Sequence, residues 1–160
     1  MMEEILIRLA HQDDYDAYCA MVSEIDSLHT NEAPWYFQHP GVPARKQEFF
    51  EGLLAAEDKD VFVAEFKGAA AGFLHMETRN VSGFEILVPL DYALVSDIVV
   101  TSPMQRKGVG LALMQQAEAW TKQRGLSQLR LNVWLFNRGA IEFYEAFGMQ
   151  AVSQIMIKRF

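Results

Sequence analysis

The sequence contains little cysteine and no long apolar run. Cys19 is the only cysteine among 160 residues, so no internal disulfide can form, and no Cys/His cluster has the spacing of a zinc site. No stretch reaches the ~18 apolar residues that a membrane helix needs. Met1–Glu4 lacks the basic start of a secretory signal. We therefore expect a cytoplasmic protein without a metal or a membrane contact.

Basic residues are also scarce. The chain has 14 Lys and Arg against 21 Asp and Glu, a formal net charge of −7. Neutralising phosphates requires an excess of Lys and Arg, so we expect no nucleic-acid partner, and the acidity favours cationic ligands only weakly. The 51% hydrophobic content suffices for a globular core. Without linker or repeat, the length predicts a single domain, residues 1–160.

Hydrophobic periodicity predicts an α/β (α+β) fold in which helices cover a mixed sheet. The predicted strands are Glu4–Leu9, Val61–Phe66, Ala69–Glu77, Tyr92–Val100, Leu129–Leu135 and Ala151–Ile157. The predicted helices cover residues 14–28, Pro43–Ala56, Val109–Gly125 and Asn137–Phe147. The nearly continuous apolar character of Tyr92–Val100 predicts a strand buried on both faces.

The segment Gln105–Gly110, which reads QRKGVG, joins this apolar strand to a helix. Gly108 and Gly110 lack a Cβ, so the backbone there can approach a ligand closely. The free N–H groups and the dipole at the start of the helix favour an anion such as a pyrophosphate. Arg106 and Lys107 add positive charge. The alternative is a turn that only tightens the strand–helix junction.

A second segment leads from a strand through Asn137 into a short helix that carries Ala140 and Tyr144. The small Ala140 would let a ligand lie against the helix. The alternative for Tyr144 is a half-buried aromatic residue with a satisfied hydroxyl.

In this order and on these elements, the two segments resemble the GCN5-related N-acetyltransferase (GNAT) superfamily, from about Ala93 to Met149. The resemblance implies the GNAT fold, a central mixed, mostly antiparallel twisted sheet of six to seven strands flanked by four helices and splayed at the acyl-CoA cleft. It implies acetyl-CoA as cosubstrate, a small-molecule or peptide amine as acceptor, and a homodimer as a candidate assembly. The implied CoA-binding residues are Ile98, Val99, Val100, Gln105, Arg106, Lys107, Gly108, Val109, Gly110, Asn137, Ala140 and Tyr144.

The implied reaction is direct attack of an amine on the thioester. A backbone N–H within Ile98–Val100 would stabilise the carbonyl oxygen, and Tyr144 would be the general acid for the departing thiolate. Asp97 is a candidate base, although strand alternation predicts that Ser96 and Asp97 point to opposite faces, which leaves open which one faces the cleft. The alternatives for the base are water, His75, Glu77 and Glu85.

The loop Leu28–His39 is dense in aromatic residues. His29, Trp35 and Phe37 are candidate acceptor-binding residues that could attract a cation through their rings, and His75 is held in reserve. The alternative is a loop that its aromatic residues fix to the core. Two competing functions remain, a non-catalytic acyl-CoA-binding sensor and an interaction domain that retains only the fold.

Overall fold

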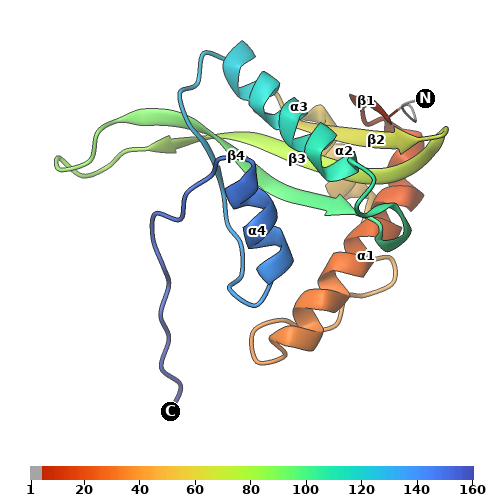
Figure 1. Ribbon diagram of the computed structural model, residues 1–160, viewed down its shortest axis with the longest axis horizontal. Coiled ribbons are helices and arrows are strands. Elements are labelled where there is room, and N and C mark those ends of the chain that lie inside the picture. Colours follow the sequence, from red (N-terminus) through yellow and green to blue (C-terminus); the bar gives the residue numbers. More distant parts are fainter. Residues whose placement is uncertain (1–4) are drawn as a thin grey trace.

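The computed structural model describes residues 5–160 (Figure 1). Its strands form one sheet in the order β1-β2-β3-β4-β5. They are β1 (Ile5–Leu9), β2 (Lys59–Phe66), β3 (Ala69–Val81), β4 (Leu90–Val100) and β5 (Leu129–Leu131). Neighbours from β1 to β4 are antiparallel, whereas β5 is parallel to β4. This confirms the mixed, mostly antiparallel sheet; Glu4 of the first predicted strand lies outside the described residues.

Four α-helices flank the sheet, as predicted. They are α1 (Tyr15–Glu32), α2 (Gln47–Ala55), α3 (Val109–Gln123) and α4 (Arg138–Ala146). Short 3₁₀ turns precede α1 (Gln12–Asp14) and follow β4 (Ser102–Met104). No helix within residues 5–160 is both long enough and apolar enough to cross a membrane.

Alternating side chains of the central strands build a core on each face of the sheet. Leu74 and Met76 pack toward α3, whose Leu113 and Trp120 are fully buried. Phe73 packs on the opposite face, in the core that α1 and α2 cover. The Trp120 indole N–H donates to Asp60 Oδ2 at 2.7 Å, so the buried ring keeps a partner for its one polar atom.

The prediction of a last strand at Ala151–Ile157 is wrong. Residues 151–160 have no regular secondary structure and are exposed, so the described sheet has five strands rather than six to seven. Apolar side chains favour a strand, but a strand forms only where a neighbour satisfies its backbone groups. β5 is also shorter than predicted, because it separates from β4 after Leu131.

Candidate active site

The sheet opens between β4 and β5. β5 pairs only with Ala93–Val95, whereas β4 continues to Val100. Residues 97–100 therefore keep β3 as a partner on one edge, and no strand within residues 5–160 pairs with the other edge. Backbone N–H and C=O groups on such an edge are available to a ligand. The predicted splay is thus present, and it exposes Ile98–Val100, the residues predicted to line the cosubstrate.

A β-bulge lies where the strands separate. His75 pairs with Asp97 and Met76 with Val95, which leaves Ser96 as an extra residue in β4. Ser96 Oγ donates to Glu77 Oε1 at 2.6 Å, and Asp97 Oδ2 lies 3.9 Å from His75 Nδ1. Because His75 and Glu77 are two residues apart in β3, they share a face. The prediction that Ser96 and Asp97 point to opposite faces is therefore wrong, because a bulge interrupts the alternation.

Glu77 is buried and fully engaged. Besides Ser96, its carboxylate binds Arg79 at 2.7 Å and Lys59 at 3.1 Å. Burial alone would raise the pKa of Glu77, but the hydrogen bonds from Ser96, Arg79 and Lys59 outweigh burial and lower the pKa to about 2. A carboxylate of such low basicity is a poor proton acceptor, so Glu77 anchors the bulge instead.

Asp97 is more accessible. Its side chain is 56% exposed, whereas His75 beneath it is buried, and His75 Nε2 has no hydrogen-bond partner among the described residues. Burial lowers the pKa of His29, although Asp26 and Asp97 both act in the opposite direction. Asp97 precedes Val99 by two residues in β4, and Val99 packs in the core that α1 and α2 cover, so Asp97 belongs to that face of the sheet. Glu85, the remaining alternative, is exposed in the loop between β3 and β4.

The QRKGVG segment shapes the start of α3. Arg106 and Gly108 have φ angles of 63° and 85°, in the left-handed region. Gly108 is the N-cap of α3 and no side chain caps this helix end. The first-turn N–H groups of Val109 and Gly110 are therefore left for another acceptor. Gln105 Nε2 donates to Val100 O at 3.2 Å and ties the segment to the end of β4.

Gly110 lies where β4, α3 and α4 meet. A Cβ built at Gly110 would have Phe143 Cζ at 3.5 Å and Val100 Cγ2 at 3.7 Å, which are ordinary contacts. Neither its φ angle nor packing within the protein requires a glycine there. A close ligand would explain the missing side chain.

α4 brings Tyr144 next to Phe143, with ring centroids 5.4 Å apart. Burial raises the pKa of Tyr144 to about 12. Tyr144 is half-buried and its hydroxyl has no hydrogen-bond partner among residues 5–160, so water or a ligand is left to satisfy it. Asn137 Oδ1 accepts from the N–H of Ala140 at 3.3 Å, which makes Asn137 the N-cap of α4. The Asn137–Ala140 spacing thus also has a local structural role.

An aromatic cluster joins the α1–α2 loop to the segment after β5. His29 stacks on Phe37 with centroids 5.0 Å apart, and Trp134 lies 5.2 Å from Phe37 and 5.1 Å from Tyr36. The cluster comprises His29, Trp35, Tyr36, Phe37, Trp134 and Phe136. It fixes the loop and still leaves Trp35 and Tyr36 exposed. The sequence prediction did not include Trp134 and Phe136. Their position at the end of the predicted strand Leu129–Leu135 was the one feature that could have pointed to them.

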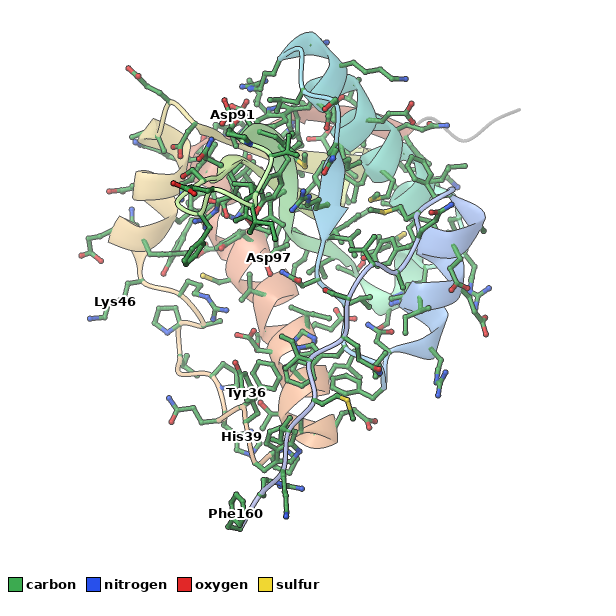
Figure 2. All side chains as sticks on the ribbon, turned by 90° about the vertical axis from the view of Figure 1, so that its left-hand side faces the viewer. Tyr36, His39, Lys46, Asp91, Asp97 and Phe160 are labelled. Carbon is green, nitrogen blue, oxygen red and sulfur yellow. The ribbon has the colours of Figure 1, made fainter. Side chains whose placement is uncertain are left out.

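A pocket of about 420 Å³ adjoins this aromatic cluster. Tyr36, Phe37 and His39 line it together with Asp26 and Arg45. Two hydrogen bonds, of 2.7 and 3.2 Å, join Arg45 to Asp26, so these charges are paired. In the view of Figure 2, Asp97 lies between Asp91 at one end and Tyr36 and His39 toward the other.

The sequence matches the Acetyltransferase (GNAT) family over residues 22–149. The chain belongs to this family. An uncharacterised N-acetyltransferase of Methanocaldococcus jannaschii is 30% identical to this chain over 102 residues. The matched residues cover 64% of this chain and 44% of that protein. Streptothricin acetyltransferase A of Bacillus subtilis is 34% identical over 89 residues, 55% and 51% of the two chains. The chain thus spans about half the length of these two relatives.

Solved structures support the GNAT fold. A mutant of the BH1408 protein from Bacillus halodurans has a TM-score of 0.92 at 19% identity, over 97% of this chain and 99% of that one. An aminoglycoside N-acetyltransferase, AAC(6')-Iy in complex with CoA, has a TM-score of 0.74 at 16% identity, over 98% and 95%. The fold implied by the resemblance is therefore confirmed, with the strand count corrected as above.

Proposed function

We propose that residues 1–160 form one acetyltransferase domain that moves an acetyl group from acetyl-CoA to a primary amine of a small molecule or peptide. One observation carries the proposal: the free edge of β4 is joined, through a short 3₁₀ turn and the QRKGVG segment, to the uncapped start of α3. An extended pantetheine arm suits such an edge, and a pyrophosphate suits such a helix end. A solved structural neighbour with this fold holds CoA, which supports the choice of cosubstrate.

The residues around this opening fit acetyl-CoA, which supplies an activated acetyl thioester. Backbone N–H groups of Arg106–Gly110 would hold the pyrophosphate at the start of α3, where no side-chain cap competes with it. Ile98–Val100 would hold the pantetheine arm. A backbone N–H on the free edge beyond the Ser96 bulge would stabilise charge on the carbonyl oxygen.

Tyr144 would hold the proton that the thiolate takes up. Its pKa of about 12 keeps the hydroxyl protonated at neutral pH, and the hydroxyl has no competing partner within residues 5–160. A neutral hydroxyl can donate a hydrogen bond to the sulfur as charge develops there.

Asp97 would receive the proton that the attacking amine loses. It lies beside the bulge on the face that α1 covers, and water can reach its carboxylate. The engaged Glu77 cannot serve in its place. Asp97 also adds negative charge close to His29, which suits an alkylammonium acceptor before it is deprotonated.

The aromatic cluster would bind the acceptor. The rings of Trp35 and Tyr36 are exposed within the aromatic cluster that contains His29, and Asp97 adds negative charge near His29. Rings with a carboxylate nearby attract cations. Two curated relatives are named for streptothricin and aminoglycoside acetylation, which supports an acceptor that carries several amines.

A pair of glycine variants tests the cosubstrate site. Gly110→Ala adds a methyl group that the protein accommodates, so the variant should fold and bind CoA about tenfold more weakly by calorimetry. Gly52→Ala, in α2 with no atom within 4 Å of the added Cβ, is the matched control and should bind CoA like the wild type. Equal CoA affinity in the two variants would contradict the proposed site.

Turnover separates an enzyme from a sensor. Wild-type protein with acetyl-CoA and a panel of polyamines, aminoglycosides and peptide amines should release CoA only when a suitable amine is present. Tight CoA binding without release for any amine would favour the acyl-CoA-binding sensor. No CoA binding at all would leave only the fold-retaining interaction domain.

A further inference from the structure

His75 is a buried polar side chain without a role in the reaction proposed above. It lies on β3 between Phe73 and Glu77 on the same face of the sheet, and its register neighbours are Val61 on β2 and Asp97 on β4. Phe73 and Val61 belong to the core that α1 and α2 cover. Only 8% of the His75 side chain is exposed. The imidazole ring therefore lies at the border between this apolar core and the carboxylate of Asp97.

The two ring nitrogens of His75 have different surroundings. Nε2 is buried and has no hydrogen-bond partner among residues 5–160, whereas Nδ1 has Asp97 Oδ2 at 3.9 Å, slightly beyond hydrogen-bond distance. A neutral imidazole carries its proton on only one nitrogen. A proton on Nε2 would be a buried donor without an acceptor, and it would leave the lone pair of Nδ1 facing a carboxylate. The proton therefore belongs on Nδ1, where it faces Asp97.

The carboxylate of Asp97 lacks a donor of its own. No group within residues 5–160 donates a hydrogen bond to it, although Ser96 beside it is bound to Glu77. Arg45 acts electrostatically on the same site, but hydrogen bonds of 2.7 and 3.2 Å join Arg45 to Asp26. The N–H at His75 Nδ1 is thus the near donor that remains available to Asp97.

We propose that His75 is a positioning residue, whose Nδ1–H holds one carboxylate oxygen of Asp97 so that the other oxygen faces the attacking amine. The inference rests on the proposed role of Asp97 as proton acceptor. Catalytic hydrogen bonds are often long without substrate and shorten when it binds, and the exposed Asp97 side chain has room to turn toward the ring. The proton moves from the amine nitrogen to the free oxygen of Asp97. His75 keeps its own proton, so no charge develops in the apolar core.

A cycle of variants separates positioning from packing. His75→Leu has no N–H, so it should lower kcat about tenfold in the wild type but less than about twofold in an Asp97→Asn background, where no carboxylate is left to position. The KM for acetyl-CoA should not change. His75→Asn keeps an amide donor at the place of Nδ1 and should stay within about threefold of the wild-type kcat. Phe73→Leu, at the next buried position on the same face, is the matched control and should leave kcat unchanged.

The proton on the His75 ring can be located in the free protein, without any substrate. Nitrogen-15 spectra of the four histidines, assigned by the signals that His75→Asn lacks, should show the proton on Nδ1.

Three outcomes would overturn the role of His75. They are a proton on Nε2, equal losses of kcat for His75→Leu in the two backgrounds, and a kcat of His75→Asn as low as that of His75→Leu. The spectra do not depend on acetyl transfer. A proton on Nδ1 in a protein that acetylates no amine would contradict the proposed function and with it the role of His75 in catalysis, whereas a proton on Nε2 in an active enzyme would contradict the role of His75 alone.

Discussion

The side chains of Ser96 and Asp97 lie on the same face of β4, although the two residues are consecutive. The bulge at Ser96 causes this, and it occurs where β5 leaves β4. Ser96 is held by the buried Glu77, so its position is fixed, while Asp97 stays exposed beside His75. One irregularity thus opens the sheet and places a carboxylate at the opening.

Asp97→Asn should lower kcat about 100-fold at neutral pH if Asp97 accepts the proton of the amine. A shift of the remaining activity to higher pH should accompany the loss, because free amine is then required. Asp91→Asn is the matched control on the same strand, where Asp91 accepts from Asn80 and lies away from the opening (Figure 2). Equal kcat values for the two variants would assign the deprotonation to water.

Tyr144→Phe should lower kcat at least tenfold with little change in CoA affinity, because the ring remains and only the proton donor is lost. Since burial raises the pKa of Tyr144 to about 12, the wild-type rate should not decline between pH 7 and 10 through its ionisation. Tyr92→Phe is the control. The Tyr92 ring in β4 lies under the Arg130 guanidinium, 4.1 Å from the ring centroid, and this contact does not need the hydroxyl. An unchanged kcat in Tyr144→Phe would rule out the general-acid role.

Trp134→Ala should raise the KM for the amine and leave the KM for acetyl-CoA unchanged. Trp134 packs against Tyr36, Phe37 and Phe136, so its removal loosens the wall proposed for the acceptor. Initial-rate kinetics with each substrate varied separately measures both constants. Phe84→Ala, an exposed aromatic in the β3–β4 loop, should change neither. A selective effect on acetyl-CoA instead would reassign the aromatic cluster to the cosubstrate.

Glu77→Gln should destabilise the protein at pH 7 by about 3 kcal/mol, the free-energy equivalent of the pKa difference. The folded pKa of about 2 lies below the ordinary 4.5, so the wild type has this stability above pH 4.5. The wild type loses it as the pH falls toward 2, whereas the variant has none to lose there. Urea unfolding across this range measures the effect, with the exposed Glu85→Gln as control. Parallel curves for wild type and Glu77→Gln would contradict the assignment.

Local sequence patterns predict most of the fold and single out the QRKGVG segment that is proposed to bind the cosubstrate. The apolar pattern predicted all four helices and β1 to β4, because their apolar residues recur at helical spacing or form strand-like runs. The sequence alone indicates the family through the spacing of Gln105, Gly108 and Gly110, followed by Asn137 and Tyr144. These features depend on residues close together in the chain, which is why the sequence reveals them.

Contacts between distant segments escaped the sequence. At the bulge, Ser96 donates a hydrogen bond to Glu77 in the neighbouring strand. Strand alternation therefore predicted opposite faces for Ser96 and Asp97, which is wrong. Trp134 joins the aromatic cluster only because the chain leaves β4 after β5 and brings it to the α1–α2 loop. Residues 151–160 have the composition of a strand, but no strand within the described residues pairs with them.

By itself, the sequence indicated the family and the order of helices and strands, and it marked QRKGVG as a candidate ligand-binding segment. Helix and strand propensity and glycine geometry act over a few residues, so local patterns reveal them. The tertiary structure alone decided where the sheet opens, that Glu77 is buried among its partners while Asp97 is exposed, and that residues 151–157 form no strand with the rest of the described chain. Those outcomes depend on which backbone edges and charges meet across the fold, and no local pattern encodes that meeting.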